Sequence, residues 1–201
     1  MTLPLAGHRG SRALALAALL LLAAPAAACA QDAQKRLADL LVEMLDRRAQ
    51  PPPTRDTMQQ LHTEINALVD RMVTRDPADF YNRKLDDLAL AALRAHRPER
   101  AAEWEAGMRR RYISQTRTVL RAIRQSLERR NLDEGAFPTT EQGLGVLLVK
   151  GARGTPYLDP AFPMKDAWGR PFVYRSPATE KPYHLSSLGP DGKEGTPDDL
   201  E

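Results

Sequence analysis

Residues 98–130 read PERAAEWEAGMRRRYISQTRTVLRAIRQSLERR, the longest uninterrupted helical pattern in the chain. Side chains suited to a core recur along one face at intervals of three and four: Trp104, Met108, Tyr112, Thr116, Leu120, Ile123 and Leu127. Pro98 is well placed in a first helical turn, and Gly107 is the weak point of the interior. At ~1.5 Å per residue this helix reaches about 45 Å, which is more than a compact domain needs.

Shorter amphipathic patterns precede this helix and predict a helical appendage over residues 31–97. The first pattern begins at Leu37 and ends at the triproline of residues 51–53. The second runs from Met58 to Met72 and the third from Phe80 to Leu93. Stripes at this spacing are usually buried, so we expect these helices to pack together.

The remaining part, residues 131–201, is rich in proline and glycine and predicts turns and short extended segments. Phe172–Tyr174 and Tyr183–Leu185 are predicted as the two strands of an antiparallel hairpin. Thr139 and Gln142 have the spacing of a capping box ahead of a short helix. A long helix with a small antiparallel sheet places the domain of residues 98–201 in the α+β class.

Residues 1–30 have the pattern of a secretory signal peptide. Arg9 and Arg12 precede an apolar run over residues 13–24, and Ala28-Cys29-Ala30 matches an A-x-A cleavage site. The run is shorter than the roughly 20 apolar residues that cross a bilayer. We therefore expect an exported protein, periplasmic or secreted.

Cys29 is the single cysteine and leaves two interpretations open. Cleavage after Ala30 removes it and starts the mature chain at Gln31. The alternative is a lipoprotein, since Ala27-Ala28-Cys29 loosely resembles a bacterial lipobox, and only then is membrane attachment expected. Both outcomes give an exported chain without disulfides.

Charge is distributed unevenly along the chain. Without Arg9 and Arg12, 27 of the 29 basic residues remain against 26 acidic ones. Residues 94–130 hold eleven arginines and four glutamates, whereas residues 131–201 hold seven bases and eleven acids. Near-zero mature charge without interleaved aromatics argues against nucleic acid. The basic segment Arg109–Arg111 is a solvated face or a contact for anionic lipid or an acidic partner.

Catalytic patterns do not emerge from the sequence. The four histidines, His8, His62, His96 and His184, fall on separate predicted elements without triad or zinc spacing. The sequence therefore predicts a protein that is not an enzyme.

The stretch SLGPDGKEGTPDD, residues 187–199, crowds three carboxylates among glycines and prolines. Asp191, Asp198 and Asp199 would repel one another if they were gathered without a cation. A solvated acidic tail is the simpler interpretation. Their spacing lacks the alternate-residue pattern of an EF-hand.

Together with two other stretches, this segment resembles a known family. LDEGAFPTTEQGL (residues 132–144), PYLDPAFPMKDAWGRPFVY (156–174) and SLGPDGKEGTPDD have the order and spacing of the GspG-type major pseudopilins of type II secretion systems. The resemblance covers about residues 112–201. It implies a pilin-like α+β fold in which a long helix packs on a small antiparallel sheet and calcium holds the C-terminal loop.

The resemblance also implies a ligand set for that calcium ion. By position, the ligands are the side chains of Asp191, Asp198 and Asp199 and the backbone carbonyls of Leu188 and Thr196. Calcium takes six to eight oxygen ligands from carboxylates and carbonyls in a flexible loop, so the residue types suit it.

The chain departs from that family upstream of the resemblance. It lacks the short basic leader, the Gly-Phe-Thr-Leu-Ile-Glu type motif and the membrane helix, and carries an export signal followed by about eighty residues of charged helix. Arg130 stands where the family usually has an aromatic residue. We expect residues 31–97 to replace the membrane anchor, so that the chain cannot enter a filament in the family's manner.

These features predict an exported, non-enzymatic, pseudopilin-like protein that is a structural or accessory component of type II secretion. Its expected partners are secretion-system components or further copies of itself. The alternative is a secreted or lipid-anchored binding module that uses the same fold for an unrelated partner.

Overall fold

The computed structural model describes residues 29–47, 55–73, 82–178 and 181–201. The predicted signal sequence up to residue 28, the triproline and Phe80 lie outside these ranges. The chain divides into two compact units, which are described here one at a time: Met1–Arg75 with Asp87–Ala101, and Asp76–Asp86 with Ala102–Glu201. The predicted division at residue 97 stays a prediction.

The first unit is helical in all its described elements. It contains a helix over residues 29–47, α2 (Arg55–Met72), most of α3 (Arg83–His96) and the first turn of α4 (Pro98–Glu134). Cys29 opens the first of these helices and is exposed. The amphipathic stripes supply the buried side chains, among them Leu37, Leu40, Leu41, Met44, Leu61, Leu68, Leu90 and Leu93.

Ion pairs join the elements of this first unit. Arg36 reaches Glu64 of α2 at 2.5 Å, and Arg100 at the start of α4 reaches Asp46 at 2.6 Å. Exposed pairs of this kind contribute little stability, typically under about 1 kcal/mol. These ion pairs link particular helices but contribute little to the stability of the unit.

Helix α4 is the longest element, with 37 residues. Its inner face buries Tyr112, Thr116, Leu120, Ile123 and Leu127, each at most 4% exposed, as the spacing predicts. The helix runs four residues past the predicted end at Arg130. It stops at Gly135, whose φ of 78° is left-handed and whose N–H donates to the Asn131 carbonyl at 2.8 Å.

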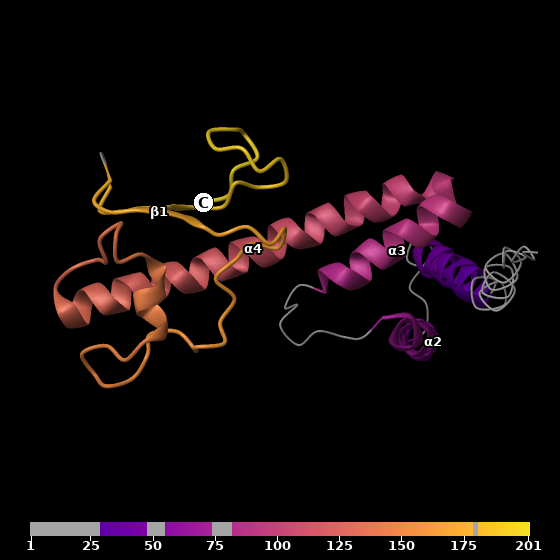
Figure 1. Cartoon of the computed structure of the whole chain (residues 1–201), viewed down its shortest axis with the longest axis horizontal. Helices are drawn as coiled ribbons and strands as arrows, with labels where there is room; N and C mark the ends of the chain where they lie inside the picture. The colour runs from indigo at the N-terminus through magenta and orange to yellow at the C-terminus, as the bar shows by residue number, and fades with distance from the viewer. Residues whose placement is uncertain (1–28, 48–54, 74–81, 179–180) are drawn as a thin grey trace, which may run out of the picture. The chain divides into compact units, whose positions relative to one another are not determined.

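The sheet lies against the inner face of α4 (Figure 1). Its strands, β1 (Val173–Arg175) and β2 (His184–Ser186), pair antiparallel with Tyr174 opposite Leu185. The antiparallel hairpin is confirmed, with both strands shifted one residue toward the C-terminus. Phe172 lies between the first strand and the bridge that joins Lys165 to Pro171, and it is buried in the core.

The segment after α4 carries the predicted capping box. The Thr139 N–H donates to Gln142 Oε1 at 2.9 Å, and the Gln142 N–H donates to Thr139 Oγ1 at 3.3 Å. The helix that follows is a 3-10 helix, Leu144–Leu148, which begins after Gly143 with no side-chain cap of its own. The reciprocal pair therefore closes a turn instead of capping an α-helix.

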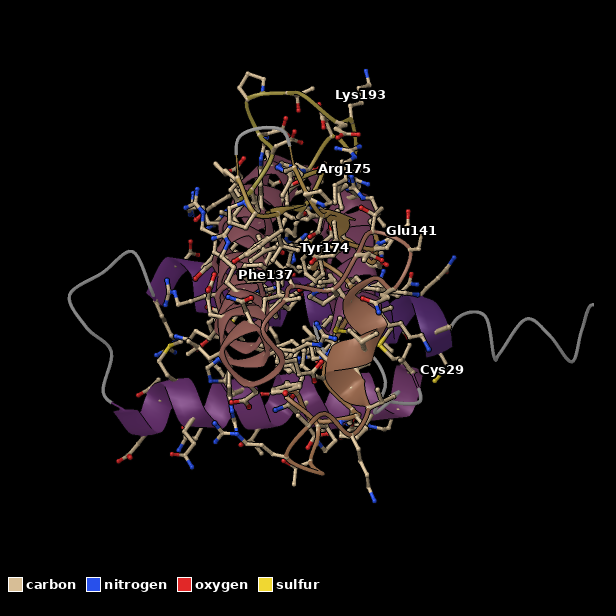
Figure 2. The ribbon with its side chains drawn as sticks, turned by 90° about the vertical axis from the view of Figure 1, so that its left-hand side faces the viewer. Cys29, Phe137, Glu141, Tyr174, Arg175 and Lys193 are labelled. Carbon is tan, nitrogen blue, oxygen red and sulfur yellow. The ribbon has the colours of Figure 1, made fainter. Side chains whose placement is uncertain are left out.

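Aromatic rings tie this segment to the sheet. The Phe137 ring lies 4.9 Å from that of Tyr183, which lies 6.1 Å from Tyr174, and Figure 2 labels Phe137 and Tyr174 in this region. Burial, with Glu128 nearby, raises the pKa of Tyr183 to about 12. Arg130 donates to the Ala136 carbonyl at 2.9 Å and so supports the same turn.

The first turn of α3 belongs to this second unit. Arg83 donates to the Trp168 carbonyl at 3.3 Å, and the buried Asp86 accepts from the Tyr112 hydroxyl at 2.8 Å and pairs with Arg111. Trp168 is half-buried and meets Tyr112 edge to face at 5.8 Å. The contact with α3 has no sequence signature.

Candidate metal centre

The acidic loop of residues 188–199 is closed at its base by a short antiparallel bridge. Ser187 and Leu200 exchange both backbone hydrogen bonds, at 2.8 and 2.9 Å. Both residues are buried, Ser187 completely. The base of the loop is thereby part of the core, and the rest of the loop projects from it.

Asp166 connects that base to the neighbouring turn. It is completely buried, and its Oδ1 accepts from the backbone N–H groups of Trp168 and Arg170 at 3.0 and 2.8 Å. Its Oδ2 accepts from the Ser187 hydroxyl at 2.8 Å. A buried carboxylate with three donors is well satisfied, so Asp166 acts as a structural support beneath the loop.

Gly189 allows the two sides of the loop to approach each other. Its φ is 59°, and a Cβ atom there would lie 2.0 Å from the Asp198 carbonyl oxygen. No other residue fits both conditions. Steric crowding and the left-handed backbone therefore explain why the sequence has glycine at position 189.

Asp198 is held by groups of the same loop. The Thr196 hydroxyl donates to its Oδ1 at 2.6 Å, and the Asp191 N–H donates to its Oδ2 at 3.0 Å. These two hydrogen bonds, the first being the larger influence, hold the pKa of Asp198 below its usual range. The carboxylate is ionised and oriented at neutral pH.

The other predicted ligands also make contacts within the loop. Asp191 Oδ1 accepts from the Lys193 N–H at 2.9 Å, and Asp199 Oδ2 accepts from the Gly195 N–H at 2.8 Å. The carbonyls of Leu188 and Thr196 accept from the N–H groups of Gly192 and Asp199, at 3.2 and 3.1 Å. All five predicted ligands lie in one closed loop.

The loop brings Asp191 and Asp198 together, but it does not gather the three carboxylates into one cluster. Across the described ranges, no three Asp, Glu, His or Cys side chains converge as metal ligands. Within the acidic loop, Asp199 Oδ1 is nevertheless buried and has no hydrogen-bond partner. A buried carboxylate oxygen without a partner is costly, and a cation is one group that would satisfy it.

Two arginines brace the outside of the loop. Arg175 binds Glu194 with both guanidinium nitrogens, at 2.5 and 2.9 Å, and Arg170 donates to the Pro190 carbonyl at 3.1 Å. The ion pair lowers the pKa of Glu194. Figure 2 shows Arg175 with Lys193 farther out, at the tip of the loop.

His184 makes a contact that the sequence pattern does not suggest. Its Nε2 lies 3.0 Å from Ser186 Oγ, and its Nδ1 lies 3.9 Å from a Glu201 carboxylate oxygen. The order serine, histidine, glutamate is that of a nucleophile and its base. Ser186 is only 2% exposed, however, so its hydroxyl does not face a substrate.

A long helix on a small antiparallel sheet, completed by a loop that returns to the core, defines an α+β domain. Residues 105–201 match the family model described as Type II secretion system (T2SS), protein G. The type II secretion system core protein G of Pseudomonas aeruginosa is 42% identical, over 39% of this chain and 60% of that protein. That of Vibrio cholerae is 34% identical, over 39% and 57%.

The C-terminal region, residues 105–201, is thus similar to the protein G family of type II secretion systems, as the sequence predicts. Both of these relatives are named as core proteins of a type II secretion system. The crystal structure of the major pseudopilin of enterohaemorrhagic Escherichia coli is also similar, with 28% identity and a TM-score of 0.41 over 48% of this chain and 90% of that one. This chain spans about 60% of the length of the relatives it matches.

Proposed function

We propose that this chain is an exported structural or accessory component of a type II secretion system, with a pseudopilin domain that calcium stabilises. The match of residues 105–201 to protein G carries the first half of the proposal. The buried Asp199 Oδ1 without a partner carries the second. Secretion-system proteins, or further copies of this chain, are the expected partners.

Calcium suits the donor set of the loop. Asp191, Asp198 and Asp199 supply carboxylates, and the carbonyls of Leu188 and Thr196 supply further oxygens, all hard ligands. With a Kd of ~10⁻⁴ M and calcium at ~1–3 mM, binding would stabilise the fold by roughly 1 to 2 kcal/mol.

Export follows from the signal-like residues 1–30, which lie before most of the described structure. None of the helices in the described ranges is long and apolar enough to cross a membrane. We propose cleavage after Ala30. Mass spectrometry of the mature protein tests this directly: a Gln31 N-terminus is expected, and a lipid-modified Cys29 would contradict it.

The role in secretion is tested in the native host. Deleting the gene should leave type II substrates inside the cell, and wild-type protein expressed from a plasmid should restore their release. Unchanged secretion in the deletion strain would contradict the role and favour the alternative, a secreted binding module with an unrelated partner. Asp198→Ala with Asp199→Ala, expressed at the wild-type level, should restore secretion poorly if calcium matters.

A further inference from the structure

The outer face of α4 carries an arginine stripe, defined here as Arg110, Arg117 and Arg121. All three side chains are exposed. Residues 106–127 contain six arginines and no lysine, aspartate or glutamate. Every charged side chain in this 22-residue stretch is therefore basic.

The three arginines of the stripe lie on the same face of the helix. With 3.6 residues per turn, positions 110, 117 and 121 lie within about 40° of one another around the axis, over roughly 16 Å of helix. Tyr112 and Thr116, on the opposite face, are buried in the domain. The stripe thus points away from the core of its own unit.

The guanidinium groups of the stripe have no partner among the described residues, neither a carboxylate nor a carbonyl. Other arginines of the chain do form ion pairs, for example Arg36 with Glu64 and Arg47 with Glu43. Like charges four residues apart, as at Arg117 and Arg121, weakly destabilise a helix. A partner that carries carboxylates would remove that repulsion.

The chemistry of the stripe distinguishes between two kinds of partner. Helices that lie on a membrane insert an apolar face, but the exposed large apolar side chains of the described structure are Leu132 and Val149, neither within the stripe. Arginine binds a carboxylate through two parallel hydrogen bonds, which gives direction as well as charge. The face favours an acidic protein surface over lipid.

We propose that the arginine stripe binds an acidic helix of a partner protein, whose carboxylates repeat at the matching intervals of four and seven residues. The contact does not involve the acidic loop. It therefore stands or falls independently of calcium binding.

A defined peptide tests this proposal with the full mature chain. The probe is a fluorescent 18-residue Ala/Gln helix with glutamates at positions 4, 8 and 15, and its control has the same composition with the glutamates spread around the helix. Arg110→Gln, Arg117→Gln and Arg121→Gln together should weaken probe binding at least tenfold in fluorescence anisotropy. A charge-matched variant, with Arg36, Arg47 and Arg129 changed to Gln, should bind within twofold of wild type.

Equal binding of the two peptides, or equal losses in the two triple variants, would overturn the proposal, because binding would then reflect net charge alone. Vesicles of 30% phosphatidylglycerol in phosphatidylcholine are the second arm. If the chain binds these vesicles through the stripe but ignores the probe, the partner is a membrane and the proposal fails. Salt-sensitive self-association that the stripe variant loses would also overturn it, in favour of a second copy.

Discussion

At the scale of single residues, the acidic loop depends on two different uses of glycine. Gly189 has a φ of 59° and faces the Asp198 carbonyl, whereas Gly195 has a φ of 83° and nothing within 4 Å of a Cβ position. Both need a left-handed backbone. Of these two glycines, only Gly189 also requires the absence of a side chain.

Gly189→Ala should therefore destabilise the protein more than Gly195→Ala. A left-handed alanine costs roughly 1 to 2 kcal/mol at either position. At Gly189 the Cβ also collides with the Asp198 carbonyl, which moves a predicted ligand. Thermal melting by circular dichroism measures the difference. Equal melting temperatures for the two variants would show that the close approach does not matter.

Asp198 makes the loop sensitive to acid. The pKa of its carboxyl is depressed in the folded state, so its ionised form stabilises the fold above the ordinary carboxyl pKa. That contribution is lost as pH falls through the depressed folded value. Wild type, with calcium removed by chelator, should lose melting temperature below about pH 4. Asp198→Asn should lose less over the same range, and parallel curves would contradict this account.

The sequence reveals the acidic residues and glycines of the loop but not how their oxygens are shared. Asp191, Asp198 and Asp199 look equivalent in the sequence. Only the structure shows that Asp198 is fully engaged by its neighbours while one oxygen of Asp199 is buried alone. Asp166, the support beneath the loop, reads in the sequence as one more residue of a turn.

At the scale of elements, α4 positions the loop through a hydroxyl in its own inner face. Thr116 is completely buried and accepts a hydrogen bond from the Ala167 N–H at 3.1 Å, next to Asp166. Periodicity alone places Thr116 on the buried face. What it cannot give is the reason for a hydroxyl at a position where valine would fit.

Thr116→Val should destabilise the domain by about 1 to 3 kcal/mol, because it leaves the Ala167 N–H buried without an acceptor. Thr116→Ser keeps the hydroxyl and should lose less. Thr118→Val is the matched control, since Thr118 is exposed and donates to the Ser114 carbonyl in its own helix. Chemical denaturation measures the three free energies of unfolding. Equal values for the Val variants would refute the role given to Thr116.

The helices and strands themselves follow closely from the sequence. Helix α4 and the β-hairpin are both predicted from periodicity and turn residues, with errors of one to four residues at their ends. The sequence predicts a capped helix after Gln142. The structure instead has a 3-10 helix, Leu144–Leu148, which follows Gly143 and has no side-chain cap. Arg83 contacts the Trp168 carbonyl, and Asp86 contacts Tyr112 and Arg111 of α4; these are long-range contacts that no local sequence pattern predicts.

At the scale of the whole molecule, the two compact units have separate sets of buried residues. The second unit holds the acidic loop and, in its core cluster, residues from Tyr112 to Leu200. Calcium bound to the loop should stabilise this unit and leave the helical one unchanged. The full chain should therefore unfold in two transitions, only one of which responds to calcium.

Differential scanning calorimetry of the full mature chain tests the calcium-stabilised fold most directly. In millimolar calcium, relative to chelator, one transition should rise by several degrees in wild type. In the variant with Asp198→Ala and Asp199→Ala, that transition should stay where chelator leaves it. If calcium moves neither transition of wild type, or moves both proteins alike, the loop does not bind calcium through these carboxylates.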